Sequence, residues 1–180
     1  MGERKQLAET ERLFLSEMTV QDTAVLFGYW SDDAVTRYMN IESFESMEPV
    51  EEMIRMLQQL ELEGKALRCV IILKRTGEII GTCGFNYIDR ENRRAEIAYD
   101  LGTRFWKKGY ATEAVVALID FGISEFALHR VEAKVDPRNQ DSIMLLEKLG
   151  FELEGRLRDY EKIGERFCDV LMYAYIKKVE

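Results

Sequence analysis

The spacing of hydrophobic and polar residues divides the chain into short strands and helices. Near-alternation of apolar and polar positions predicts strands, whereas apolar positions that recur every three or four residues predict helices. Strands are expected at residues 12–17, 67–73, 79–88, 95–101, 131–135, 151–158 and 168–176. Helices are expected at residues 19–28, 48–64, 109–126 and 140–149, with a short one after Ser31.

Capping residues and glycines support several of these boundaries. Thr19 followed by Asp22 forms a capping box, and Pro49 suits the first turn of its helix. Gly64 and Gly150 follow apolar stripes and suit the left-handed position that ends a helix. No repeat, linker or low-complexity tract interrupts this order. Residues 1–180 are therefore expected to form one domain around a mixed α/β sheet.

Composition and charge narrow the classes of partner. The formal net charge is −8, which argues against a nucleic acid and suits an amine-bearing partner. Cys69, Cys83 and Cys168 form no C-x-x-C pair, so neither a zinc site nor a disulfide framework is indicated. The polar N-terminus and the lack of a long apolar run predict neither a signal peptide nor a membrane span. We expect a cytoplasmic protein without a bound metal.

The most informative stretch is residues 95–126, which combine a strand, a polar turn and a helix. The first N–H groups of a helix lack internal partners, and the helix dipole adds partial positive charge there. Gly109 and Ala111 allow close approach of a ligand, and Lys107 and Lys108 add charge, so the turn suits an anion. The turn matches neither a nucleoside-triphosphate P-loop nor a dinucleotide fingerprint. A solvated lysine pair before an ordinary core helix is the alternative interpretation.

The turn resembles the acyl-coenzyme A loop of the GNAT acetyltransferase superfamily. The pattern of that loop is (Q/R)-x-x-G-x-(G/A), where x is any residue. Here Trp106 stands at the first position in place of Gln or Arg, while Gly109 and Ala111 match the pattern. Three further segments also resemble the family: RLFLSEMTVQD, EIIGTCGFNYID and VDPRNQDSIMLLEKLGFELEG. The ending RDYEKIGERFCDVLMYA is similar to the branch of ribosomal-protein N-terminal acetyltransferases (RimJ/RimL type). This similarity covers nearly the whole chain.

The resemblance implies a GNAT fold with a mostly antiparallel sheet whose strands 95–101 and 131–135 splay apart. It implies acetyl-CoA as cosubstrate, with its pyrophosphate on the loop amides and its pantetheine arm between the splayed strands, where backbone groups near Tyr99, Asp100 and Leu101 would pair with the arm. Asn139 has a second interpretation as a helix N-cap. The residues implied in cofactor binding are Tyr99, Leu101, Trp106, Lys107, Lys108, Gly109, Tyr110, Ala111, Thr112, Asn139 and Ser142.

The resemblance also implies catalytic residues. The tyrosine that protonates the leaving thiolate in many relatives corresponds to Leu146, so the branch's serine, Ser142, takes that role here. Ser142 has the alternative interpretation of a first-turn helix residue. For the base, the branch's glutamate corresponds to Glu161, for which an ordinary exposed hairpin residue is the alternative. Glu96 is a second candidate base, because its strand lies beside the thioester.

The expected function is transfer of an acetyl group from acetyl-CoA to a primary amine by direct attack. A protein N-terminal α-amine is the first expectation for the acceptor, and a polyamine or antibiotic amine is the alternative. A non-catalytic acyl-CoA-binding module and a nucleotide-binding domain that takes NAD or ATP are the alternatives from other classes. Neither nucleic acid nor membrane is expected as a partner. A homodimer that pairs through the apolar final strand is possible.

Overall fold

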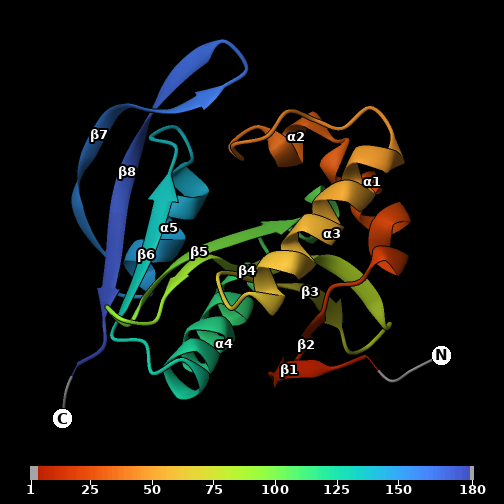
Figure 1. Ribbon diagram of the computed structural model, residues 1–180, viewed down its shortest axis with the longest axis horizontal. Coiled ribbons are helices and arrows are strands. Elements are labelled where there is room, and N and C mark those ends of the chain that lie inside the picture. The colour runs from red at the N-terminus through yellow and green to blue at the C-terminus, as the bar shows by residue number, and fades with distance from the viewer. Residues whose placement is uncertain (1–3, 179–180) are drawn as a thin grey trace.

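Residues 4–178, described by a computed structural model, fold around one eight-stranded sheet (Figure 1). The strand order is β1-β2-β3-β4-β5-β6-β8-β7. The strands are β1 Gln6–Glu9, β2 Leu13–Glu17, β3 Leu67–Leu73, β4 Glu78–Asp89, β5 Arg94–Leu101, β6 Arg130–Val135, β7 Glu152–Ile163 and β8 Arg166–Ile176. The helices are η1 Val20–Asp22, α1 Thr23–Trp30, α2 Asp33–Thr36, α3 Met47–Leu62, η2 Thr103–Phe105, α4 Tyr110–Glu125 and α5 Gln140–Lys148.

Helices cover both faces of the sheet. In Figure 1, α1, α2 and α3 lie in front of it, and α4 and α5 lie behind it. The larger core forms where α4 and α5 pack on the sheet, and it includes the fully buried Phe85 and Leu118. A smaller core under α1 and α3 is built around Trp30 and Ile54. Burial of these apolar side chains is the main force that holds the three layers together. None of the helices in the described range is long and apolar enough to cross a membrane.

The sheet opens between β5 and β6, as expected. These strands are parallel, whereas every other pair is antiparallel. They are paired only along Arg94–Glu96 and Arg130–Glu132, and beyond this point they diverge (Figure 1). The remaining backbone groups on the facing edges of the two strands therefore lie beside a gap, where an extended ligand has the geometry to pair with them.

The ends of the elements agree with the sequence prediction where a local signal marks them. Asp22 Oδ2 accepts a hydrogen bond of 2.8 Å from the Thr19 amide, which is half of the expected capping box. Gly64 and Gly150 follow α3 and α5 with φ angles of 70° and 84°. The first helix ends at Trp30 rather than near residue 28, because Gly28 does not have the positive φ of a glycine that ends a helix.

Two predictions of strand structure were wrong. The final hairpin was expected to end in a long loop, but β7 and β8 continue to a tight turn at Gly164 (φ 57°), and their polar, exposed residues hid the strand pattern. The short polar β1 was not predicted at all, because it has no apolar alternation. The last strand, β8, pairs with β7 on one side and, along residues 171–176, with β6 on the other, so only residues 166–170 have an edge without a strand partner. Pairing with a second copy through this strand stays a prediction.

Candidate active site

Two cavities meet in the gap between β5 and β6. The first, about 400 Å³, lies beside η2 and the start of α4, and we call it the loop-side cavity. The second, about 590 Å³, lies between α3 and the β7–β8 hairpin, and we call it the hairpin-side cavity. Both cavities are lined by Tyr38, Met39, Tyr99, Asn139 and Ser142. The two cavities therefore form one cleft with a shared junction.

The loop-side cavity ends at a turn with unusual backbone geometry. Lys107 has a φ of 59° and Gly109 a φ of 79°, so two residues of the turn are left-handed. Gly109 is the N-cap of α4, and the first amides of that helix follow it. Left-handed backbone is costly for a residue other than glycine, and such strain tends to occur at binding sites. The turn thus fits an anionic group on structural grounds as well as by sequence.

Most of the residues expected to bind the cofactor line this cavity. Those that do are Tyr99, Leu101, Trp106, Lys107, Gly109, Tyr110, Ala111, Thr112, Asn139 and Ser142. Lys108 is the exception, because its ammonium donates a 2.7 Å hydrogen bond to the carbonyl of Arg104 on the outside of the turn. A role for Lys108 in binding stays a prediction that its side chain does not support in this conformation.

Trp106 has a specific structural role at the position where the family pattern has Gln or Arg. Its indole Nε1 donates a 2.7 Å hydrogen bond to the carbonyl oxygen of Leu101, the last residue of β5. This bond fixes the start of the turn to the end of the strand. A side-chain amide or guanidinium carries the same kind of donor, so the indole is a chemically sensible replacement.

A brace that the sequence did not reveal holds the turn from the opposite side. Arg12 donates to Glu113 Oε2 at 2.6 Å and to the Lys108 carbonyl at 3.0 Å. Glu113, in the first turn of α4, also accepts hydrogen bonds from the Arg12 amide and from Thr10. Burial works to raise the pKa of Glu113, but the hydrogen bonds from Thr10 and Arg12 and the charge of Arg12 outweigh it. The net pKa of Glu113 is therefore below its usual value. Residues 10–13 and the turn are far apart in sequence, so only the fold brings them together.

The junction of the cavities contains a hydroxyl pair. Tyr99 Oη and Ser142 Oγ lie 2.7 Å apart. Burial raises the pKa of Tyr99 to about 12, and the Ser142 hydrogen bond only partly opposes this. The Asn139 side chain accepts a 3.2 Å hydrogen bond from the Ser142 amide, so its expected role as N-cap is confirmed. Only a backbone role was predicted for Tyr99 from the sequence, and the part played by its side chain was not foreseen.

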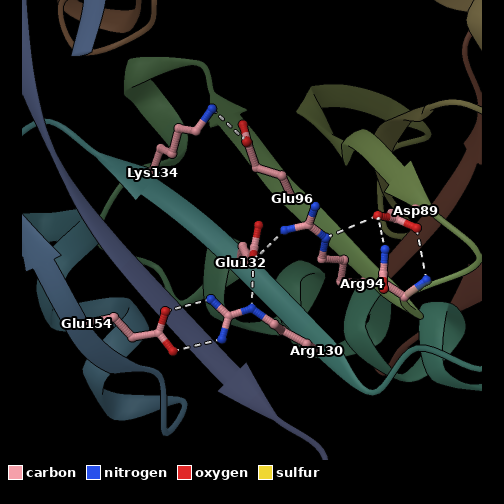
Figure 2. Close-up of polar contacts among 8 residues, drawn as sticks. Asp89, Arg94, Glu96, Arg130, Glu132, Lys134 and Glu154 are labelled. Carbon is pink, nitrogen blue, oxygen red and sulfur yellow. Dashed lines mark hydrogen bonds and ion pairs between the residues drawn. The ribbon is translucent and has the colours of Figure 1, made fainter. Parts of the chain in front are cut away.

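Three charged residues from strands β5, β6 and β7 meet in the hairpin-side cavity. Lys134 Nζ on β6 lies 2.9 Å from Glu96 Oε2 on β5 and 4.0 Å from Glu161 Oε1 on β7. Figure 2 shows Lys134 and Glu96 pointing toward each other across the opening of the sheet. Glu161 was expected either as a base or as an ordinary residue of an exposed hairpin tip. Its side chain is only 24% exposed and lines the cleft, so the second interpretation is wrong.

The environment shifts the pKa values of two members of this cluster. Burial raises the pKa of Glu161, the Lys134 charge works to lower it, and the Glu96 charge raises it further. For Lys134, burial works to lower the pKa, but the hydrogen bond and charge of Glu96 outweigh it and the net pKa is raised. A carboxylate with a raised pKa in a cleft is suited to accept a proton near neutral pH.

A larger ion-pair network lies on the same strands, next to the point where β5 and β6 separate. In Figure 2, Arg130 stands between Glu132 and Glu154, and Arg94 between Glu132 and Asp89. Arg130 donates at 2.6 Å to both of its partners. This network holds together the paired ends of the two strands, which fixes where the gap begins.

The floor of the hairpin-side cavity rests on a buried ion pair. Arg68 on β3 and Asp100 on β5 are both below 10% exposed and lie 3.2 Å apart. Asp100 also accepts hydrogen bonds from Trp30 and Thr82, so both oxygens of the carboxylate are hydrogen-bonded. A buried charge is tolerated only when it is paired in this way. The other wall of the cavity is apolar and comes from α3 and the segment before it; it contains Met39, Ile41, Met53, Met56, Leu57 and Leu60.

Comparison with known proteins decides the family. The family described as acetyltransferase (GNAT) domain matches residues 12–152. The chain belongs to the GNAT acetyltransferase family. This GNAT enzyme is 54% identical over 169 residues to the uncharacterized N-acetyltransferase p20 of Bacillus licheniformis, and the match covers 94% of this chain and 95% of the relative. It is an N-acetyltransferase of the acetyl-CoA-using family, so the alternative of a nucleotide-binding domain for NAD or ATP is wrong.

Two other similarities concern substrates. The ribosomal protein uS5-alanine N-acetyltransferase of Escherichia coli (strain K12) is 31% identical over 120 residues, which are 66% of this GNAT chain and 62% of the relative. The crystal structure of the microcin C7 self immunity acetyltransferase MccE, in complex with acetyl-CoA and AMP, has a TM-score of 0.84 and 26% identity. That match covers 93% of this chain and 94% of the other.

Proposed function

We propose that the protein transfers an acetyl group from acetyl-CoA to a primary amine held in the hairpin-side cavity. The single observation that carries this proposal is the junction: an anion-binding turn on one side and a half-buried carboxylate on the other open onto the same hydroxyl pair. A module that only bound acyl-CoA would need the first cavity alone. The second cavity, with its charged and apolar walls, gives an acceptor a place beside the thioester.

The proposed donor site follows the loop-side cavity. The amides after Gly109 bind the pyrophosphate, Lys107 adds positive charge, and the unpaired edge of β5 from Ile97 to Leu101 pairs with the pantetheine arm. Asn139 and Ser142 face the same arm from α5. When bound, acetyl-CoA supplies the activated acetyl group. The remaining steps are carried out by the side chains of this chain.

The proposed reaction needs one proton acceptor and one proton donor. Glu161 takes one proton from the acceptor ammonium, and the neutral amine attacks the carbonyl carbon of the thioester. The new C–N bond forms and the C–S bond breaks, leaving an amide and a thiolate. The second amine proton neutralises the thiolate through Ser142, whose hydroxyl is held by Tyr99. One proton leaves to solvent from Glu161, so charge and atoms balance.

The acceptor that we favour is a protein N-terminal α-amine. The E. coli relative named above acts on an alanine of ribosomal protein uS5, and its similarity supports this class. The cleft is also consistent with it, because an N-terminal residue carries both an ammonium and a side chain, and the cavity has an acidic wall opposite an apolar one. A small-molecule amine is the second candidate.

Ligand-dependent melting and thiol release test the proposal. Acetyl-CoA at 100 times its Kd is expected to stabilise the protein by about 2.7 kcal/mol. For a domain of this size this corresponds to roughly 5–10 °C in Tm. With N-terminal peptides or simple amines, free thiol should then form at a rate proportional to enzyme. Stabilisation by acetyl-CoA with no thiol release from any amine would contradict the proposed activity and favour a binding module.

Replacing Ser142 with Ala is expected to lower kcat roughly 10- to 100-fold, because the thiolate loses its hydroxyl partner. The KM for acetyl-CoA should rise much less, since the loop amides are untouched. The Asn139 cap accepts from the backbone amide of residue 142, so the helix is retained. Tyr99→Phe removes the hydroxyl behind Ser142 and should give a smaller loss. Equal kcat values for native enzyme and Ser142→Ala, measured by thiol release, would rule out this role.

A further inference from the structure

Lys134 lies at different distances from the two carboxylates of the cleft, Glu96 and Glu161. Its ammonium is in hydrogen-bond contact with Glu96 at 2.9 Å, while Glu161 lies at 4.0 Å and has no hydrogen bond from it. All three side chains are between 17% and 24% exposed, so their charges are only partly screened by water. The proposed function needs one carboxylate that is free to take a proton, and the cleft contains two.

We propose that Lys134 is a positioning residue for acetyl transfer: it pairs with Glu96 and thereby leaves Glu161 as the carboxylate that takes the proton of the acceptor ammonium. This inference rests on the proposed function and adds a reason for the choice between the two carboxylates. A lysine that is salt-bridged to one carboxylate occupies an oxygen of that carboxylate. The other carboxylate then faces the acceptor with a free lone pair.

The place of Lys134 follows from the geometry of the sheet. Glu96 is paired with Glu132 at the last register position before β5 and β6 separate. Lys134 is two residues further along β6, on the same face, where no strand pairing remains between these two strands. Its long side chain therefore crosses the opening of the sheet (Figure 2). On its other side, β6 pairs with β8 and β8 pairs with β7, which carries Glu161.

The positive charge of Lys134 also affects the protonation of Glu161. With Lys134 present, the cluster carries a net charge of −1 toward a cationic acceptor. Without it, two carboxylates would share the opening, and like charges at short range favour retention of a proton by one of them. A protonated Glu161 cannot act as a base. Removal of the lysine is therefore expected to act on the protonation of the base as well as on packing.

The other charged side chains near the cluster have ion-pair partners of their own, and the remaining titratable neighbours are tyrosines and a cysteine. The Tyr160 ring on β7 faces the Lys134 ammonium at 5.1 Å, and Cys168 on β8 is paired with Glu161 in the strand register. Asp169 on β8 accepts from Arg156, and Asp136 after β6 accepts from Arg138. Two remaining tyrosines, Tyr38 and Tyr87, line the same cavity.

The test compares pH profiles of kcat for native enzyme, Lys134→Met and Glu96→Gln with one acceptor amine. The acid limb of the profile is the region where kcat falls as pH drops. It should move to higher pH by about one unit in Lys134→Met, because the charge that lowers the pKa of Glu161 is lost. In Glu96→Gln it should move to lower pH, because a negative charge that raises this pKa is lost. Lys134→Arg should restore a near-native limb. Lys162→Met, an exposed residue of β7, removes the same charge and should leave the limb in place.

Each outcome supports or overturns the inference. If the acid limb stays at its native pH in both Lys134→Met and Glu96→Gln although kcat falls, Lys134 is merely structural and the inference is overturned. Loss of activity in Glu96→Gln with near-native activity in Glu161→Gln means that the roles are reversed, which overturns it while acetyl transfer stands. If native enzyme acetylates no amine, the proposed function itself fails. If Lys134→Met does not fold, Glu96→Gln and Lys134→Arg still decide the direction of the shift.

Discussion

Replacing Glu161 with Gln is expected to lower kcat about 10²- to 10⁴-fold, the usual contribution of a general base. Glutamine keeps the shape of the side chain and cannot accept the ammonium proton. The KM for acetyl-CoA should change little, because Glu161 lines the hairpin-side cavity and not the loop-side cavity. Burial raises the pKa of Glu161, so kcat of the native enzyme should fall as pH drops through that pKa. The Gln variant should lose this acid limb.

Glu165 offers a matched control in the same hairpin. Its side chain is 96% exposed, so Glu165→Gln removes the same charge without changing the cleft. This variant should have native kcat and a native pH profile. Thiol release at saturating acetyl-CoA and amine, measured over a pH series, checks both variants. A Glu161→Gln enzyme within threefold of native kcat would exclude Glu161 as the base.

Replacing Gly109 with Val is expected to raise the KM for acetyl-CoA about tenfold or more and to remove most of its effect on Tm. At a φ of 79° a β-branched residue is strained, and its Cβ would lie 3.3 Å from the Arg12 guanidinium. Relief of this strain moves the amides that follow. A hydrogen bond to a charged group contributes about 1.5–3 kcal/mol, so loss of one amide is enough for this effect.

Gly77 provides the control for backbone strain. It has a φ of 70° in the turn between β3 and β4, and nothing lies within 4 Å of a Cβ placed there. Gly77→Val should therefore lower Tm through the same conformational cost while leaving the KM for acetyl-CoA unchanged. Melting curves with and without acetyl-CoA, together with KM values, separate the two effects. An equal shift of KM in both variants would show that the loop assignment is wrong.

The sequence by itself was sufficient for features that depend on short segments. The turn at Lys107 and Gly109 was found because a strand, a glycine and a helix N-terminus follow one another directly, and local backbone chemistry needs no tertiary contact. The cap at Asn139 was found for the same reason. The tip of the hairpin was harder to predict, because β7 is largely polar and exposed and β8 also begins with two exposed residues, so apolar alternation does not mark the strands there.

Other features were fixed only by contacts between distant segments. Tyr99 was expected to act through its backbone, and its hydroxyl became part of the site because α5 carries Ser142 to within 2.7 Å of it. Arg12 braces the cofactor turn because β2 lies beside the start of α4. No spacing rule predicts such pairs, because their separation in space depends on how the sheet and helices pack.

The contributions of sequence and tertiary structure differ most clearly for the proposed general base. The sequence offered Glu161 as the first candidate base and Glu96 as the second, and gave no physical ground for choosing between them. The proposed ground is Lys134, which lies 2.9 Å from Glu96 and 4.0 Å from Glu161. That difference arises because β5 and β6 separate after a short paired segment, which places three strands around one opening. The sequence thus determined which residue types reach the site, and the tertiary structure decided their distances and burial, on which the proposed roles depend, because local sequence does not encode them.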